Sequence, residues 1–92
     1  MATIGIETIF SEVKNLLQDK YHDCEINMDT FLEFGSGSFL DMSSLDIVEF
    51  IVDLETKYDI IIDIEDRYYT VGDAVRGVEK YLREKEDLEN NF

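Results

Sequence analysis

The chain has 92 residues, 45% of them hydrophobic, and contains no proline. This length and composition predict one folded domain over residues 1–92 and exclude a disordered chain. Its 22 acidic and 8 basic residues give a formal net charge of −14. Such a charge repels nucleic-acid phosphates and anionic lipids and attracts basic proteins, so we expect no nucleic-acid partner, no membrane insertion and a monomer.

The beginning of the chain has neither the basic segment of a secretion signal nor an apolar run that could span a membrane, so we expect a cytoplasmic protein. Cys24 is the only cysteine and His22 the only histidine. A single cysteine cannot build an internal disulfide framework, and this pair is too small for a zinc or haem ligand set. We therefore expect no metal site and interpret both residues as incidental loop features.

Apolar residues recur at intervals of three and four from Ile6 to Leu17, a spacing that places them on one helical face. We predict an amphipathic helix from Ile4 to Asp19. The following segment, Lys20 to Met42, has poor periodicity and contains the flexible-loop sequence GSGS. We predict a long loop here. The apolar residues expected to hold it against the core are Phe31, Leu32, Phe34, Phe39 and Leu40.

The clearest helix signal is SLDIVEFIVDLETKY, from Ser44 to Tyr58. Ser43 and Asp46 have the spacing of a capping box, in which each side chain satisfies the other residue's backbone N–H, so the helix is predicted to begin at Ser44. A projection at about 100° per residue separates a core face from a solvent face. The predicted core face contains Ile47, Val48, Phe50, Ile51, Leu54 and Tyr58, and the solvent face contains Leu45, Glu49, Val52 and Thr56.

The run DIIIDIEDRYY, residues 59–69, is rich in β-branched residues, but a single strand would have no pairing partner. We predict an extended connector leading to a short helix near Glu65 to Tyr68. Thr70 and Asp73 form a second capping signal, followed by apolar residues at helical spacing up to Leu82. The last helix is predicted to begin here, and the polar tail from about residue 84 is predicted to fray.

Three longer amphipathic helices and one short helix predict an all-α fold, a small four-helix bundle with a long loop between the first and second helices. The solvent face of the second helix places Leu45 and Val52 on either side of Glu49. Although single exposed apolar residues need no explanation, this mixture of apolar and acidic residues favours a docking surface. We expect its partners to carry Lys or Arg around an apolar pocket.

The segment SSLDIVEFIVDLETKYDI, Ser43 to Ile60, resembles the Asp-Ser-Leu motif and acidic second helix of the acyl carrier protein family, including its peptidyl carrier relatives. TVGDAVRGVEKYL, Thr70 to Leu82, is similar to the family's last helix. The resemblance implies that Ser44 receives a 4′-phosphopantetheine arm from coenzyme A through a phosphopantetheinyl transferase. It implies a free-standing carrier, not an enzyme, that holds acyl intermediates as thioesters in fatty acid, polyketide or related biosynthesis.

The resemblance also implies which positions meet loading and processing enzymes that have basic docking patches. The chain departs from the family's motif at Ser43, where an aspartate is usual, and at Asp41, where a glycine is usual. Serine caps a helix as well as aspartate does, so the helix start is expected to survive. A phosphodiester on Ser44 would lie at a helix N-terminus, which favours negative charge. The implied partner-binding residues are Leu45, Asp46, Glu49, Val52, Asp53 and Glu55.

No histidine or lysine adjoins Ser44, and the serine lacks the glycine-flanked turn of a hydrolase nucleophile, so we expect no catalytic residue. Two alternatives stay open: an aminoacyl or peptidyl carrier of a nonribosomal pathway, and an unmodified acidic adaptor that binds basic partners. A calcium sensor is disfavoured. The acidic residues between Asp59 and Asp66 lack the alternating ligands and central glycine of an EF-hand loop.

Overall fold

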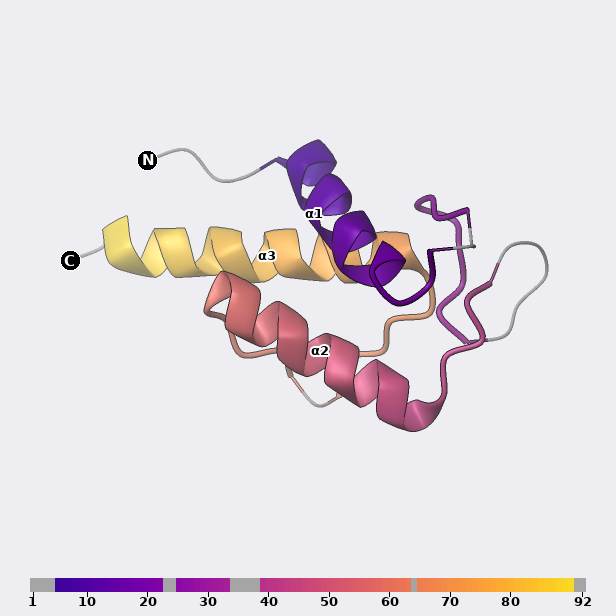
Figure 1. Cartoon of the computed structure of the whole chain (residues 1–92). Coiled ribbons are helices and arrows are strands. Elements are labelled where there is room, and N and C mark those ends of the chain that lie inside the picture. Colours follow the sequence, from indigo (N-terminus) through magenta and orange to yellow (C-terminus); the bar gives the residue numbers. More distant parts are fainter. Residues whose placement is uncertain (1–4, 23–24, 34–38, 64, 91–92) are drawn as a thin grey trace.

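The computed structural model describes residues 5–22, 25–33, 39–63 and 65–90. These residues form three helices, α1 (Ile6–Gln18), α2 (Ser44–Tyr58) and α3 (Val71–Asn90). Figure 1 shows α1 and α2 lying against different parts of α3, with the long α1–α2 loop at the end where α3 begins. The all-α class and the long loop between the first two helices are confirmed, whereas only three helices are present in the described ranges.

α1 begins at Ile6, after Gly5, and ends at Gln18, so it is slightly shorter than predicted. Ile9, Val13 and Leu17 are buried, and their spacing of four residues places them on one face of the helix. This face packs against α3, whose buried residues belong to the same core. The amphipathic pattern in the sequence therefore identified the buried side of α1 correctly.

α2 has the predicted bounds, and it buries Phe50, Leu54 and Tyr58. The predicted core face is wrong at one position, because Val48 is 57% exposed. At about 100° per residue, Val48 projects about 100° away from its neighbour Ile47, which places it at the margin of the face that meets the core. Ile47 and Ile51 are half-buried, so the contact face of α2 is narrower than the projection suggests.

The α1–α2 loop is attached to the core at several points. Leu32 and Leu40 are buried as predicted, whereas Phe31 is half-buried, Phe39 is exposed and Phe34 lies outside the described residues. The Leu32 N–H donates to the Tyr69 carbonyl, at 2.9 Å. The loop is thus joined by backbone hydrogen bonds to the residues that precede α3, with isolated bridges from Phe31 to Phe39 and to Thr70.

The connector between α2 and α3 forms no strand in its described residues, as expected, but the short helix predicted near Glu65 to Tyr68 is absent. Two side-chain hydrogen bonds, one local and one from α3, explain the difference. The Asp63 carboxylate accepts from the Glu65 N–H at 2.8 Å, and the Tyr81 hydroxyl donates to the Asp66 carboxylate. Bonds of this kind compete with helical ones, and here they produce a turn.

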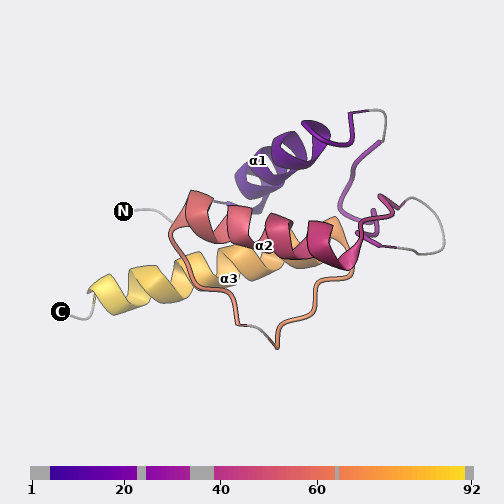
Figure 2. The ribbon, with the colours of Figure 1, turned by 60° about the horizontal axis from the view of Figure 1, so that its bottom comes forward.

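α3 continues to Asn90, through the segment that the sequence predicts to fray. Two ion pairs lie near the start of this segment. Arg83 pairs with Glu79 at 3.1 Å just before it, and Lys85 within it pairs with Asp59 at 3.0 Å. The pair one turn apart supports the helix itself, and the second pair joins α3 to the end of α2. Figure 2 shows the last turns of α3 extending past the other two helices. No described helix is both long and apolar enough to cross a bilayer.

Candidate functional site

The start of α2 is fixed by the predicted capping box. Ser43 has extended backbone, with φ −74° and ψ 168°. Its hydroxyl oxygen accepts from the Asp46 N–H at 3.1 Å, and the Asp46 carboxylate accepts from the Ser43 N–H at 3.1 Å. Ser44 is therefore the first helical residue, and it is exposed at the tip of the helix.

The first backbone N–H groups of α2 remain available to an external anion. The N–H groups of the first helical residues have no acceptor within a helix. In α2 the cap takes the Asp46 N–H, and the structure gives the N–H groups of Ser44 and Leu45 no acceptor among the described residues. In α3 the corresponding groups of Val71 and Gly72 bond loop carbonyls at 2.9 Å. Among the helices in the described ranges, only α2 begins with an exposed serine, and it has N–H donors without a described acceptor beside that serine.

The chain approaches α2 through a left-handed residue, Asp41, whose φ is 57°. Glycine adopts this conformation without strain, and aspartate tolerates it better than most residues. The geometry gives a physical reason for the glycine usual at this position of the resembled motif. Met42 follows and is buried, so the turn is anchored on its helix side.

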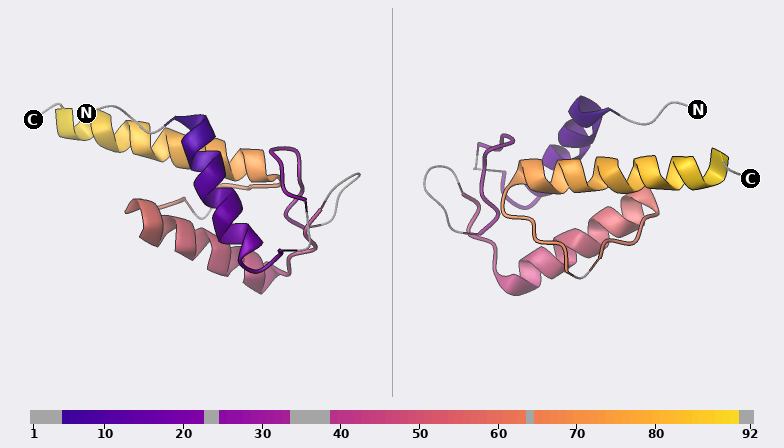
Figure 3. Two further views of the ribbon diagram at one scale, coloured as in Figure 1. Left: turned by 45° about the horizontal axis from the view of Figure 1, so that its top comes forward. Right: turned by 180° about the vertical axis from the view of Figure 1, so that it is seen from behind.

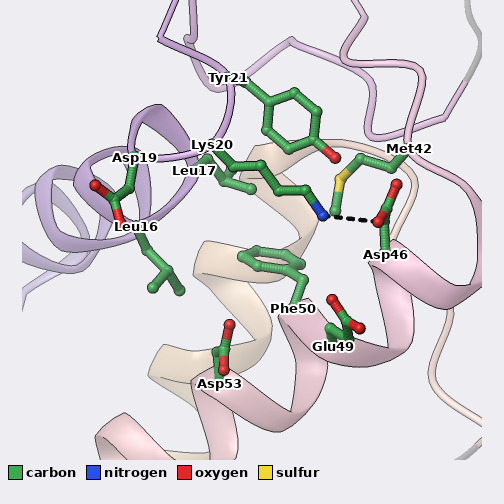
Figure 4. Close-up of a pocket in the computed structure, with 10 residues that line it drawn as sticks. All are labelled: Leu16, Leu17, Asp19, Lys20, Tyr21, Met42, Asp46, Glu49, Phe50 and Asp53. Carbon is green, nitrogen blue, oxygen red and sulfur yellow. Dashed lines mark hydrogen bonds and ion pairs between the residues drawn. The ribbon is translucent and has the colours of Figure 1, made fainter.

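A salt bridge joins the end of α1 to the first turn of α2. The Lys20 ammonium lies 2.7 Å from the Asp46 carboxylate (Figure 4). The hydrogen bond from Lys20 lowers the pKa of Asp46 to about 2, with further contributions from the backbone and hydroxyl of Ser43. The same bond raises the pKa of Lys20. Because these residues lie 26 positions apart, no local sequence signal predicts the pair.

The salt bridge lies in a groove of about 310 Å³ between α1 and α2. Figure 4 shows the Lys20 side chain reaching across this groove toward α2. Acidic side chains from both helices surround an apolar floor. The groove is lined by Leu16, Leu17, Asp19, Lys20, Tyr21, Met42, Asp46, Glu49, Phe50 and Asp53.

The predicted partner-binding residues divide into two groups. Leu45, Glu49, Val52 and Asp53 are exposed, and Leu45 and Val52 are 67% and 50% accessible. Asp46 and Glu55 are partly buried and have partners within the chain: Asp46 binds Lys20, while Glu55 accepts from the Ile62 N–H at 2.8 Å. The freely presented part of this surface is therefore smaller than the sequence suggests.

Val48 extends the exposed surface. Its spacing from Leu45 and Val52 is three and four residues, which places the three side chains in one stripe. We call Leu45, Val48 and Val52 the apolar stripe of α2. Sequence reasoning missed Val48 by assigning it to the core, and the helical spacing from Leu45 was the signal that could have found it.

A second groove, of about 460 Å³, runs between α2 and the connector. Val48 and Val52 line it together with two half-buried isoleucines of α2, Ile47 and Ile51. On the connector side the groove is bounded by Ile62, Asp63, Asp66 and Arg67. The wall formed by α2 is thus almost entirely aliphatic.

No catalytic or metal-binding cluster accompanies Ser44 in the part of the chain that the structure describes. His22 is exposed in the α1–α2 loop, and Cys24 lies outside the described residues. No group of His, Cys, Asp and Glu side chains suited to a metal ion is found in the described ranges. Ser44 has neither a histidine nor a lysine as a sequence neighbour, and no described contact supplies it with a general base.

Comparison with known proteins identifies the family. Over 78 residues the chain is 35% identical to an acyl carrier protein of Lactobacillus acidophilus, an alignment that covers 82% of this chain and 94% of that protein. The chain belongs to the acyl carrier protein family. It is also 32% identical over 85 residues to an acyl carrier protein of Karelsulcia muelleri, covering 87% and 96% of the two chains. No protein-family model and no solved structure matches the chain.

Acyl carrier proteins are carriers and not enzymes, so this family member is a carrier protein. Membership implies a phosphopantetheine prosthetic group and partner biosynthetic enzymes. The start of α2 fits such a group, because Ser44 is exposed and the N–H donors of Ser44 and Leu45 suit the phosphate of an attached arm.

Proposed function

We propose that Ser44 carries a 4′-phosphopantetheine arm, on which acyl intermediates are held as thioesters for fatty acid, polyketide or related biosynthesis. One observation carries the proposal: the Ser44 hydroxyl is exposed on the first residue of α2, beside backbone N–H groups with no acceptor in the described chain. A phosphodiester formed there would gain hydrogen bonds and the favourable end of the helix dipole.

The geometry favours Ser44 over its neighbour. The Ser43 hydroxyl oxygen accepts from the Asp46 N–H, so its modification would disturb the cap that starts the helix. Ser44 takes no part in the capping box, and the arm can be added to its oxygen without breaking a described bond. The lysine at position 20 also neutralises the Asp46 carboxylate, two residues from Ser44, which reduces repulsion of an incoming phosphate.

The proposed attachment is a transfer from coenzyme A. The Ser44 oxygen forms a bond to the phosphorus of the pantetheine phosphate, the phosphoanhydride bond to 3′,5′-ADP breaks, and the serine proton passes to a base of the phosphopantetheinyl transferase. Because no general base adjoins Ser44 in the described structure, activation belongs to the transferase. The chain's own contribution is to present the hydroxyl and bind the resulting anion.

Partner enzymes are proposed to dock on α2 through complementary charge and shape. The apolar stripe offers three exposed aliphatic side chains, and Glu49 and Asp53 are exposed acids on the same helix. An enzyme with Lys or Arg around an apolar depression would be steered by the negative field and retained by apolar contact. The net charge of −14 supports this steering and opposes self-association, in keeping with a monomer.

The aliphatic wall of the groove beside α2 supports an acyl cargo in preference to an aminoacyl one. Ile47, Val48, Ile51 and Val52 line this wall, and burial of hydrocarbon against it is favourable. An aminoacyl group with a short side chain would bury less hydrocarbon against this wall. We propose a cytoplasmic location on chemical grounds, because coenzyme A and the biosynthetic enzymes are found there.

Intact-mass measurement tests the proposal. Incubation of the protein with coenzyme A and a broad-specificity phosphopantetheinyl transferase is expected to add the mass of one arm. Ser44→Ala removes the acceptor oxygen and is expected to show no gain. Ser43→Ala is the matched control, and it is expected to keep the gain because the acceptor at position 44 is intact.

Other outcomes overturn the proposal in distinguishable ways. Gain in Ser44→Ala and its loss in Ser43→Ala would move the attachment point by one residue. Absence of gain in the parent protein with several transferases would leave an unmodified adaptor, whose partner binding should survive Ser44→Ala but not charge reversal at Glu49 and Asp53. Mass spectrometry of thioesters recovered from cells would separate acyl from aminoacyl cargo.

A further inference from the structure

Lys20 is the only basic residue among the ten described residues that line the α1–α2 groove. Four carboxylates share this groove with it, and the Lys20 ammonium bonds Asp46 at 2.7 Å. The other carboxylate oxygen of Asp46 accepts from the Ser43 N–H at 3.1 Å. Both oxygens of Asp46 are therefore engaged before any partner arrives.

Glu49 and Asp53 differ from Asp46 in this respect, because the structure gives neither of them an ion pair among the described residues. Glu49 is close enough to Lys20 for its charge to contribute to the raised pKa of the lysine. The acidic side of α2 is thus divided between one neutralised carboxylate at the helix tip and two that are open to a partner.

The Lys20–Asp46 pair is accessible enough for another cation to replace Lys20 at Asp46. The Lys20 side chain is 55% exposed and that of Asp46 is 27% exposed. Ion pairs this accessible are weak and exchange readily, because water solvates both partners when the pair opens. The stem of Lys20 lies over a floor that includes Leu17 and Phe50, so the groove already accommodates one long basic side chain.

We propose that Lys20 is a specificity-determining residue that occupies Asp46 in the free chain and is displaced from it by a lysine or arginine of the docking enzyme. This inference rests on the proposed function, since it concerns the enzymes that act at Ser44. Asp46 lies two residues from Ser44 and nearer to it in sequence than Glu49 or Asp53, so the exchanged cation would be the charged partner contact nearest to the attachment point.

The exchange has a consequence for partner choice. An enzyme that places a cation at Asp46 recovers the energy of the broken pair, whereas one that contacts only the apolar stripe leaves Lys20 in place and gains nothing there. Lys20 lowers the affinity for every cationic partner by the cost of opening its own pair. Partners that open the pair but place their Lys or Arg poorly at Asp46 do not recover this cost, and they are thereby disfavoured.

The test compares Lys20→Met with the matched control Lys14→Met. Both variants remove one positive charge and keep a long apolar stem. The Lys14 ammonium, in α1, lies over the Phe10 ring and not in the groove. With a phosphopantetheinyl transferase at saturating coenzyme A, Lys20→Met is expected to lower KM for the protein about two- to fivefold, as expected for an exposed pair. The value of kcat should stay unchanged.

The control separates exchange from general attraction. Lys14→Met increases the net negative charge equally, so a KM decrease as large as that of Lys20→Met would overturn the proposal in favour of long-range steering. Asp46→Asn keeps an oxygen acceptor for the Ser43 N–H but removes the charge that Lys20 binds. In that background Lys20→Met is expected to have no further effect on KM, and an undiminished effect would also overturn the proposal.

A second readout does not depend on modification of Ser44. Carboxyl chemical shifts followed by NMR should show the Asp46 pKa rising in Lys20→Met and staying low in Lys14→Met. An unchanged Asp46 pKa in Lys20→Met would overturn the proposal by showing that the pair is not formed in solution.

If no transferase modifies the parent chain, the proposed function fails and the exchange is tested with the cationic tripeptide acetyl-Arg-Leu-Arg-amide. Its half-saturation concentration, read from the Asp46 amide resonance, is expected to be about two- to fivefold lower in Lys20→Met than in the parent chain. Equal values in Lys20→Met and Lys14→Met would overturn the exchange itself.

Discussion

α2 and α3 begin with the same kind of capping box, but the first turn of α2 is exposed and that of α3 is buried. Ser43 and Asp46 exchange side-chain-to-backbone bonds at the start of α2, and Thr70 and Asp73 do so at the start of α3, each with its hydroxyl acceptor 3.1 Å from the acidic residue's N–H. The first helical residue is the exposed Ser44 in α2 and the fully buried Val71 in α3. A capping box thus sets where a helix begins, while the residues around it decide whether that end binds the core or an external group.

The backbone donors follow the same division. In α3 the N–H groups of Val71 and Gly72 bond the carbonyls of Thr30 and Met28. The carbonyls of the α1–α2 loop thus accept from the first N–H groups of α3, whereas the corresponding N–H groups of α2 have no acceptor in the described residues. A helix end becomes an anion site only when its donors are left over after folding, and among these two helices α2 meets that condition.

The largest predicted difference in stability is between substitutions at the first residue of α3 and at the first residue of α2. Val71→Ala removes buried methyl groups from the core and is expected to lower the free energy of unfolding by about 2 kcal/mol. Ser44→Ala, at the equivalent position of α2, is expected to change it by less than about 0.5 kcal/mol because the side chain is exposed. Urea denaturation of the two variants measures this difference. Equal losses would show that the first turn of α2 is also part of the core.

The two caps should be matched in strength. Ser43→Ala and Thr70→Ala each remove one hydroxyl acceptor for an N–H group, and each is expected to lower the free energy of unfolding by about 1 kcal/mol. Thermal melts of the two variants provide the comparison. If only one of the two substitutions were destabilising, the caps would not be equivalent. The start of the other helix would then be set by its tertiary contacts.

The smallest predicted change in the free energy of unfolding is at Asp41, where the chain enters α2. Asp41 has φ 57°, and Asp41→Gly is expected to raise the free energy of unfolding by about 0.5 kcal/mol because glycine adopts this conformation without steric cost. The matched control is Asp59→Gly at the left-handed C-cap of α2, where loss of the side-chain bond to Lys85 offsets the gain. Chemical denaturation would contradict the strain argument if Asp41→Gly were destabilising.

Local patterns predicted the helix starts well. The capping spacing of Ser43 with Asp46, and of Thr70 with Asp73, identified both starts because these bonds form within four residues. The exposure of Leu45, Glu49 and Val52 was also predicted correctly, since it follows from the 3.6-residue period alone. Their contact with partners stays a prediction.

Features that depend on distant residues were missed. Val48 was placed in the core because a helical projection cannot say how wide the buried face is, and that width depends on neighbouring helices. The turn at Glu65 depends partly on Tyr81 bonding Asp66, 15 residues away. The Lys20–Asp46 pair requires the long loop to return α2 to the end of α1, which no local pattern encodes.

The capping box of α2 is closed entirely within residues 43–46. Its bonds do not involve the core, so separation of the helices elsewhere in the bundle leaves the shape of this tip intact. Acyl carrier protein family membership implies several partner enzymes. Each of them can therefore meet the first turn of α2 in the same geometry, whatever changes occur elsewhere in the bundle.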